Sequence, residues 1–307
     1  MPSCPAGAEG YGATMRILLA GASGLIGSEV ARLAAGEHEV RALVRRPPVG
    51  EREIRWDPAS GIAPLAAIRE ADAVISLSGA SLSRLPWTRR YREEILRSRV
   101  QATGALARAI ADADAPPIWV SGSAVGFYGD RPGEVLGDDA ARGSGFLADV
   151  VEAWERATAP AEARTRVVHA RTGLVLAGGG ALKPLILATR LGLGATVGDG
   201  RQHWPWISLV DEARALLHLA TASELAGPVN LVGPGSATSE EITVALARVL
   251  RRPHALRLPA FALRAGMGLA AEELLLADQR AEPTRLREDG FAFTTPTVAE
   301  AVSAAVR

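Results

Sequence analysis

The stretch MRILLAGASGLIGSEVARLAAG, from Met15 to Gly36, decides the fold of this chain. Its apolar run Ile17–Ala20 is typical of a strand that is covered on both faces. The apolar residues farther along repeat at helical period, and Gly36 stands where a helix C-terminal glycine is expected. Between the two lie three glycines at three-residue spacing, Gly21, Gly24 and Gly27. The stretch therefore predicts a buried strand, a glycine turn and a helix.

Such a turn forms a phosphate-binding cradle. Gly21 permits the tight turn, Gly24 lets the backbone approach a pyrophosphate, and Gly27 lets the helix lie close to the strand. The free N–H groups and the positive dipole end of the helix then meet the anion. An ordinary glycine-rich turn is the alternative, but the position after the first strand favours a dinucleotide site. The predicted contact residues are Gly21, Ala22, Ser23, Gly24, Leu25, Ile26 and Gly27.

The second predicted strand, Glu39–Val44, ends in two arginines, Arg45 and Arg46. A cofactor with a free ribose 2′-hydroxyl is usually held here by an acidic residue about 20 residues past the glycines. No acidic residue stands at this strand end, and a guanidinium suits a 2′-phosphate by charge and geometry. The sequence thus favours NADP over NAD. Arg45 comes first after the strand and is the predicted ligand, whereas Arg46 is also consistent with a solvated basic turn.

Length and composition narrow the function further. A chain of 307 residues accommodates one large α/β domain or a main domain with a smaller lobe. Its 34 basic and 34 acidic residues balance, so nucleic acid and membrane surfaces are not expected partners. Cys4 is the only cysteine, which rules out an intramolecular disulfide and fits a cytoplasmic protein. Residues 1–14 are rich in Gly, Ala and Pro and are expected to form a disordered extension.

Strand patterns alternate with helix patterns from Met15 to Leu176, which predicts a doubly wound parallel sheet of Rossmann type. We expect a dinucleotide-binding domain made of residues 15–176 and 206–233, and a smaller substrate lobe made of residues 177–205 and 234–307. Asp211 is the expected N-cap of a helix over 212–222.

Two loops at the carboxyl ends of predicted strands suit ligand binding, because ligands of open parallel sheets bind there. Ser78 and Gly79 follow the strand Ala73–Leu77, in a loop of small residues that can pass beneath a cofactor. The strand Ile118–Val120 runs into a stretch that contains Ser123 and Tyr128. These hydroxyls are candidates for the floor of an active site.

The residues quoted so far resemble an extended short-chain dehydrogenase/reductase, and more narrowly its atypical "epimerase family" branch with its own C-terminal domain. The resemblance covers the chain from Met15 almost to Arg307. Its motifs are GASGLIG at 21–27, DAVISLSG at 72–79, WTRRYREEILRSRV at 87–100, SAVGFYG at 123–129, RTGLVL at 171–176, RLGLGATVGDGRQHWPWISLVD at 190–211, and the tail from LRLPAF to FAFTTPT.

This resemblance implies a bound NADP, with Arg45 at its 2′-phosphate and Leu77 and Ser78 beside it. It also implies cofactor contacts for Glu94 and Arg99, the latter in the place of an asparagine of typical extended members. Val175 would lie near the nicotinamide end. A homodimer is a further family-level expectation.

The sequence departs from the superfamily at the catalytic pair. The chemistry of the superfamily rests on a Tyr-x-x-x-Lys pair, whose lysine lowers the pKa of the tyrosine. The corresponding helix here begins at Phe146, with Val150 in the lysine position, and neither side chain can exchange a proton. Ser123 and Tyr128 are therefore the predicted catalytic residues, and Lys183, the only lysine, is a weaker candidate.

Two functions remain open from the sequence. The first is an NADP-dependent oxidoreductase or nucleotide-sugar-epimerase-like enzyme that acts on a small carbonyl or hydroxyl compound. The second is an NADP(H)-binding sensor with little or no turnover, which the missing Tyr/Lys pair favours. The five histidines are scattered and show no metal-ligand spacing, so no metal is expected.

Overall fold

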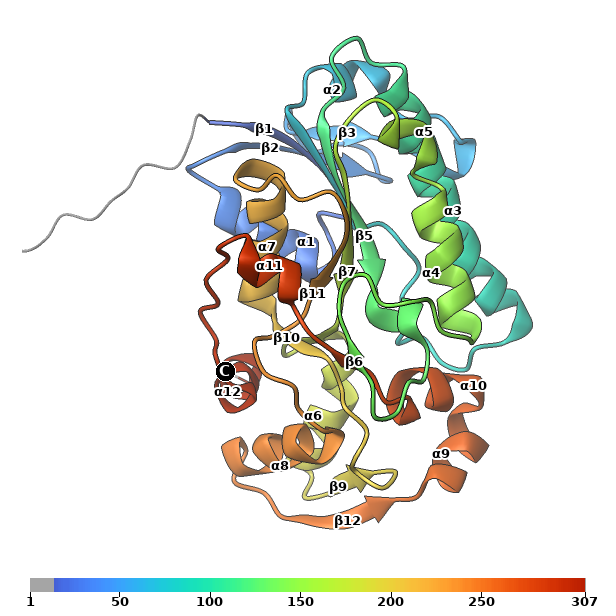
Figure 1. Ribbon diagram of the computed structural model, residues 1–307, viewed down its shortest axis with the longest axis vertical. Coiled ribbons are helices and arrows are strands. Elements are labelled where there is room, and N and C mark those ends of the chain that lie inside the picture. Colours follow the sequence, from blue (N-terminus) through green and yellow to red (C-terminus); the bar gives the residue numbers. More distant parts are fainter. Residues whose placement is uncertain (1–13, 307) are drawn as a thin grey trace, which may run out of the picture.

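The computed structural model describes residues 14–306, and its centre is a seven-stranded sheet in which every pairing is parallel (Figure 1). The strand order is β11-β7-β5-β4-β1-β2-β3. The strands are β1 (Arg16–Ala20), β2 (Glu39–Val44), β3 (Glu53–Arg55), β4 (Ala73–Ser76), β5 (Ile118–Ala124), β7 (Val167–Thr172) and β11 (Gly227–Leu231).

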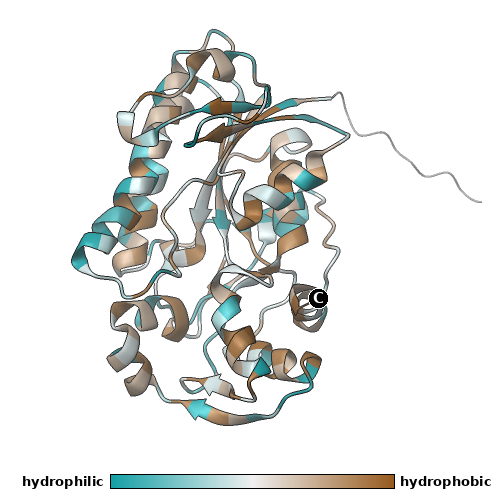
Figure 2. Cartoon of the chain, turned by 180° about the vertical axis from the view of Figure 1, so that it is seen from behind, coloured by the Kyte–Doolittle hydropathy of each residue, from teal (hydrophilic) through white to brown (hydrophobic). Residues whose placement is uncertain are grey.

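Helices cover both faces of this sheet. One face carries α1 (Leu25–Ala34), α7 (Leu209–Thr221) and α11 (Thr284–Glu288), and the other carries α2 (Leu65–Arg69), α3 (Arg89–Ala111), α4 (Phe146–Arg156) and α5 (Ala159–Glu162). Because side chains alternate along a strand, Leu18 packs in the core under α2 and α3, whereas Leu19 packs in the core under α1 and α7. Teal and brown residues alternate along α3 in Figure 2, as expected of a helix with one face on the sheet. The predicted doubly wound parallel sheet is confirmed.

A second, smaller core lies beyond the carboxyl ends of the strands, at the bottom of Figure 1. It includes Leu182, Trp204, Ile242 and Val302, all of which are buried. Its elements are α6 (Lys183–Arg190), β9 (Gly194–Val197), α8 (Ser239–Val249), β12 (His254–Leu258), α9 (Ala260–Met267), α10 (Leu269–Ala271), a π-helical turn (Glu272–Leu276) and α12 (Val298–Val306). The pair β8 (Leu174–Leu176) and β10 (Trp206–Ser208) connects the main sheet to this core.

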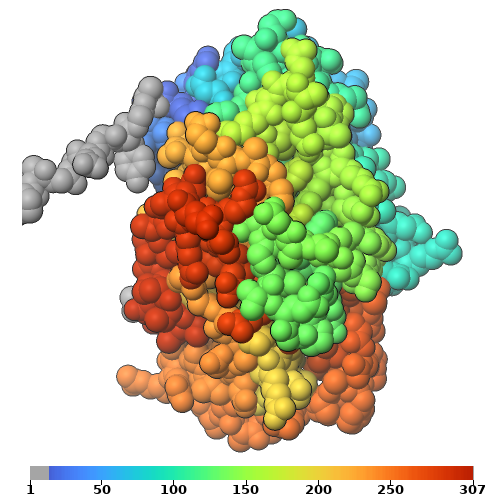
Figure 3. Space-filling view, in the orientation of Figure 1, coloured from blue at the N-terminus to red at the C-terminus, as the bar shows by residue number. Residues whose placement is uncertain are grey.

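The C-terminal segment then returns to the main sheet, where red and green residues meet in Figure 3. The strand β13 (Arg280–Ala281) pairs with β6 (Val135–Leu136), and Leu286 and Phe291 are buried in the core beneath α7. Residues after 280 thus contribute to the main core as well as to the smaller one.

Two details differ from the sequence predictions, and one prediction lies largely outside the described residues. The strand β5 continues to Ala124, so Ser121 and Ser123 are strand residues, and a short 3₁₀ turn (Val125–Tyr128) follows it. Ser208, and not Asp211, is the N-cap of α7, because its hydroxyl accepts from the Asp211 N–H. The predicted extension falls on residues 1–13, which lie outside the described part of the chain, and on exposed Thr14.

Candidate functional site

The loop between β1 and α1 has the geometry of the predicted cradle. Gly21 has φ +91°, and a Cβ built there would lie 3.0 Å from the carbonyl carbon of Leu77. A Cβ on Gly27 would overlap the backbone of Gly21, so only glycine lets the helix approach this closely. Gly24 is the N-cap of α1, and neither a side-chain cap nor an acidic residue occupies the first turn. The first N–H groups of α1 are therefore available to an anion.

The remaining residues of the predicted cradle lie in two settings. Ser23, Gly24 and Leu25 are exposed, whereas Ala22 and Ile26 are partly buried against the core of the sheet. Ala22 and Ile26 thus anchor the loop, and Ser23 to Leu25 form its outer surface.

The two arginines after β2 differ in their partners. Arg46 donates to both carboxylate oxygens of Glu53, at 2.7 and 2.5 Å. Arg45 is exposed and makes no hydrogen bond or ion pair with any residue in the range 14–306. The guanidinium of Arg45 is thus the one that remains available to a ligand at this strand end.

The loop after β4 lies against the cradle and is held by α3. The Ala80 N–H donates to the hydroxyl of Ser98 (3.0 Å), and Arg99 donates through Nη1 to the Ala80 carbonyl (3.1 Å). Gly79 leaves room for this guanidinium, because a Cβ there would lie 3.1 Å from the Arg99 Cζ. Ser78 is partly buried beside them. The structure thus brings the predicted loop 77–79 together with Arg99.

Arg99 is buried without a carboxylate partner among the described residues. Its guanidinium bonds only to the carbonyls of Ala80 and Ile95 and lies 5.1 Å from the ring centroid of Trp154. Burial lowers the pKa of Arg99 to about 10, so the side chain remains charged at neutral pH. A buried cation of this kind favours a nearby anion, because no carboxylate among the described residues balances its charge.

Two other predicted contacts lie in different settings. Glu94 forms an ion pair with Arg97 on α3, and no hydrogen bond or ion pair in the described structure joins it to the loop after β4. Val175 lies in β8, where it pairs in register with Ile207 of β10 and packs against the main core just beyond β7.

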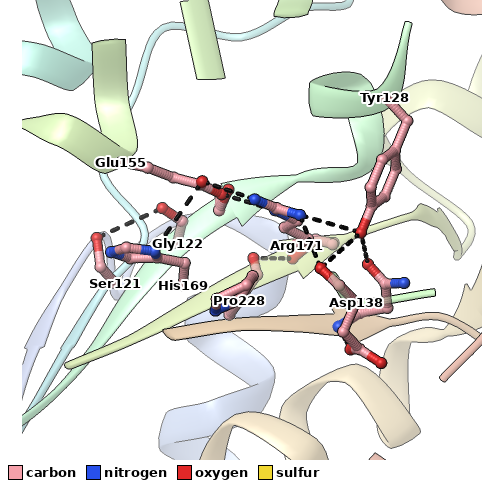
Figure 4. Close-up of polar contacts among 12 residues, drawn as sticks. Ser121, Gly122, Tyr128, Asp138, Glu155, His169, Arg171 and Pro228 are labelled. Atoms are coloured by element: carbon pink, nitrogen blue, oxygen red, sulfur yellow. Dashed lines mark hydrogen bonds and ion pairs between the residues drawn. The ribbon is translucent and has the colours of Figure 1, made fainter. Parts of the chain in front are cut away.

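Ser123 and Tyr128, the predicted catalytic residues, belong to one buried polar network. Figure 4 shows Tyr128, Glu155 and Arg171 of this network. The Ser123 hydroxyl donates to Oε1 of Glu155 at 2.6 Å. Arg171 donates to both oxygens of Glu155 at 2.8 and 2.9 Å, and its Nη1 donates to the Tyr128 hydroxyl at 3.1 Å. That hydroxyl in turn donates to Asn230 at 2.7 Å.

This network leaves Tyr128 poorly suited to proton exchange. The side chain is fully buried, and burial raises the pKa of its phenol. Both its donor and its acceptor capacity are used within the protein. Ser123 is also buried, with 4 % of its surface exposed, and Glu155 fixes its hydroxyl. The geometry therefore favours a supporting role for Tyr128, and it ties any role of Ser123 to Glu155.

The two positions predicted to correspond to the superfamily's tyrosine and lysine lie in apolar packing. Phe146 and Val150 both belong to a cluster with Trp87, and the rings of Phe146 and Trp87 meet edge to face at 5.6 Å. The N-terminus of α4 is capped from the smaller core, since Glu273 accepts from the N–H groups of Phe146 (2.7 Å) and Leu147 (3.1 Å).

Another buried acidic residue, Glu212, lies in α7, on the sheet face opposite to α3. Glu212, in the first turns of α7, is fully enclosed and accepts from the Thr172 hydroxyl at 2.7 Å. Its second oxygen has no partner in the described structure. Burial raises the pKa of Glu212 to about 8, so the carboxyl is largely protonated at neutral pH.

Lys183 is the weaker catalytic candidate from the sequence, and His203 lies in the segment between β9 and β10. Lys183 is exposed at the start of α6. His203 is held by Asp278, which lies 2.8 Å from its Nδ1. Within residues 14–306, no group of three or more His, Cys, Asp or Glu side chains is arranged to hold a metal, and no helix has the length and apolar character to cross a membrane.

The glycine turn, the uncapped helix and the parallel sheet have counterparts in known proteins. Residues 17–233 match the model of the NAD dependent epimerase/dehydratase family, and residues 258–305 match a domain of unknown function, DUF1731. The chain belongs to the NAD dependent epimerase/dehydratase family. Within it, an epimerase family protein of Mycobacterium leprae is 42% identical over 290 residues, which cover 94% of each chain.

Two solved structures of family-like proteins resemble the whole chain. The crystal structure of human epimerase family protein SDR39U1 with NADPH has a TM-score of 0.85 and 33% identity, and the match covers 95% of this chain and 99% of that one. MoeE5 in complex with UDP-glucose and NAD has a TM-score of 0.75 and 25% identity, with 95% and 97% covered. The resemblance to the epimerase family branch of the extended short-chain dehydrogenases/reductases is confirmed.

Sequence reasoning missed the ion pair of Glu155 and Arg171, although a signal was present. Glu155 follows Val151 by one helical turn, on the face of α4 that also carries the buried Trp154. Arg171 lies in a strand whose other residues are mostly apolar. Two opposite charges at buried positions of neighbouring elements indicate a pair, because neither tolerates burial alone.

Proposed function

We propose that this protein binds NADP(H). Arg45 and Arg99 carry the proposal, since both are cations without an acidic partner in the described structure. Arg45 follows the end of β2 and Arg99 contacts the loop after β4, both beside the uncapped start of α1. Arg45 suits a 2′-phosphate, and Arg99 suits the pyrophosphate or the adjoining ribose. A neighbour crystallised with NADPH supports this assignment.

We further propose that the bound cofactor serves an oxidoreductase or epimerase-like reaction on a small carbonyl or hydroxyl compound. The cofactor would supply the hydride chemistry, and the chain would orient both molecules. Of the two predicted hydroxyls, that of Ser123 is the better placed for proton exchange. The Glu155 carboxylate accepts and orients its O–H, whereas the Tyr128 hydroxyl is fully enclosed. Water is the other proton source.

A second candidate function is an NADP(H) sensor with little or no turnover. The apolar packing of Phe146 and Val150 favours it, because the usual proton-transferring pair has no substitute on α4. Glu155 and Asn230 also hold the two nearby hydroxyls in contacts within the protein.

One experiment separates these functions. Purified protein is titrated with NADPH and NADH by fluorescence, and the oxidation of NADPH is then followed with a panel of sugars, ketones and quinones. Tight NADPH binding with turnover supports the enzyme, and tight binding without turnover on any compound supports the sensor. Absence of NADPH binding would refute both.

A further inference from the structure

Two arginines of α3 stack on aromatic rings of α4. The guanidinium carbon of Arg92 lies 5.9 Å from the ring centroid of Phe146, and that of Arg99 lies 5.1 Å from Trp154. The two arginines are seven residues apart, which is about two helical turns and about 10 Å along the axis. Both side chains therefore leave the same face of α3 and line its seam with α4.

Neither arginine has an acidic partner in residues 14–306. The acidic residues in the first turns of α3 are paired elsewhere, Glu93 with Arg89 and Glu94 with Arg97. The Nε of Arg92 is buried and makes no hydrogen bond. A buried N–H without an acceptor is unfavourable, and no described residue supplies an acceptor to the Nε of Arg92.

The two arginines lie at different places along α3. Arg99 bonds to the loop after β4, next to the cradle. Arg92 lies nearer the start of α3, beside a cluster in which Phe146 and Trp87 pack with Met267 and Leu274 of the C-terminal segment. Arg92 is thus placed where the smaller core meets the sheet domain.

We propose that Arg92 binds an anionic group of the substrate, a phosphate or a carboxylate. This inference rests on the proposed function, since it assigns Arg99 to the cofactor and the region of the smaller core to the substrate. Arg92 lies about 10 Å from Arg99 along α3, so the substrate anion and the cofactor pyrophosphate are assigned to different parts of the same helix. The substrate class is therefore a phosphorylated or carboxylated carbonyl or hydroxyl compound.

Calorimetric titration of the full chain saturated with NADP⁺ tests this assignment. The probes are glucose 1-phosphate, UDP-glucose, glucuronate and neutral glucose. We expect at least one anionic probe to bind at millimolar concentration and glucose to bind much more weakly. Arg92→Gln should weaken the anionic probe about 10- to 100-fold, as expected on losing a charge-assisted hydrogen bond, and Arg92→Lys should retain part of the affinity.

Arg90→Gln is the matched control, because Arg90 is exposed on the same helix and its substitution changes the net charge equally. Equal affinities of the wild type and Arg92→Gln would overturn the inference, and so would an equal loss in Arg90→Gln or the failure of every anionic probe to bind. The binding of phosphate without glucuronate, or the reverse, would identify the anion.

NADPH titration of the same variants keeps this inference distinct from the proposed function. Arg92→Gln should bind NADPH as the wild type does, and a loss there would place Arg92 at the cofactor and overturn the substrate assignment. A wild type that binds no NADPH would instead refute the proposed function. Matching circular dichroism spectra and melting temperatures show that each variant is folded.

Discussion

The carboxylate of Glu273 accepts hydrogen bonds from the backbone N–H of Phe146, 127 residues earlier in the chain, and from that of Leu147. Gly145, the N-cap of α4, has no side chain and φ +117°, and a Cβ there would lie 2.7 Å from Oε1 of Glu273. The cap of this helix is therefore supplied by the C-terminal segment and not by the adjacent residue.

Glu273→Ala should lower the free energy of unfolding by about 1 to 2 kcal/mol, because two N–H groups lose their acceptor. Urea unfolding measures the change. Glu272→Ala is the control, since Glu272 pairs with Arg264 at the surface and should contribute less than about 1 kcal/mol. A larger loss at Glu272 than at Glu273 would contradict the capping role.

Glu212→Gln should change how stability depends on pH. The pKa of Glu212 is about 8 in the folded chain, compared with its ordinary value of 4.5. Between these two pH values, the native state keeps a proton that the unfolded state has released. This group therefore stabilises the fold fully at acid pH, and its contribution declines between about pH 4.5 and 8 by up to about 1.4 kcal/mol per unit.

Unfolding free energies measured from pH 5 to pH 8 test that slope. Glu212→Gln keeps the shape of the neutral acid, so we expect near wild-type stability at pH 5 and a smaller decline toward pH 8. The same decline in the variant would show that Glu212 is ionised in the fold.

Arg45→Gln should reduce the preference for NADPH over NADH. The loss of one charge-assisted contact with a 2′-phosphate weakens NADPH binding about 10-fold or more and leaves NADH nearly unchanged. Arg46→Gln is the neighbouring control, because Glu53 already holds Arg46. Fluorescence titration of both cofactors measures the ratio, and an unchanged ratio in Arg45→Gln would rule out the assigned contact.

Gly27→Ala should disrupt the cradle, because its Cβ overlaps the backbone of Gly21 and α1 must move away. We expect a loss of about 1 to 3 kcal/mol in unfolding free energy together with weaker NADPH binding. Gly50→Ala is the control, since no atom lies within 4 Å of a Cβ at that position. Wild-type NADPH affinity in Gly27→Ala would argue against the cradle.

Tyr128→Phe and Ser123→Ala test which of the two hydroxyls stabilises the fold and which one exchanges a proton. Tyr128→Phe removes the donor to the buried Asn230 Oδ1 and the acceptor of one Arg171 N–H, so it should lower stability by about 1 to 3 kcal/mol. If Ser123 exchanges the proton, Ser123→Ala lowers kcat more than KM for any substrate identified in the panel. Unchanged turnover in Ser123→Ala would leave water as the proton source.

Local signals made most of the sheet domain predictable. The apolar run of β1, the glycine spacing and the arginines after β2 each act within a few residues, and the resemblance located Arg99 on α3. The end of β5 was not predictable. The strand runs through Ser123, whose hydroxyl bonds to Glu155 on α4, and the residue pattern of β5 alone does not reveal that partner.

Long-range pairing was not predictable from one sequence. Asn230 and Tyr128 are 102 residues apart, and Glu273 and Phe146 are 127 apart. The first contact depends on β11 pairing with β7, and the second depends on where the C-terminal segment reaches α4. Residue periodicity encodes neither. The predicted catalytic use of Tyr128 depended on the same missing information, because only the fold shows its hydroxyl enclosed.

The return of the C-terminal segment to the sheet has a consequence for biosynthesis. Leu286 and Phe291 complete the main core, and Asp211 at the start of α7 accepts from Thr294 and Thr295. A nascent chain therefore cannot close its principal hydrophobic layer until these late residues have left the ribosome. The strand β1 can pair with β2 and β4 earlier, but the core that contains its Ile17 and Leu19 stays incomplete until Leu286 and Phe291 have been synthesised.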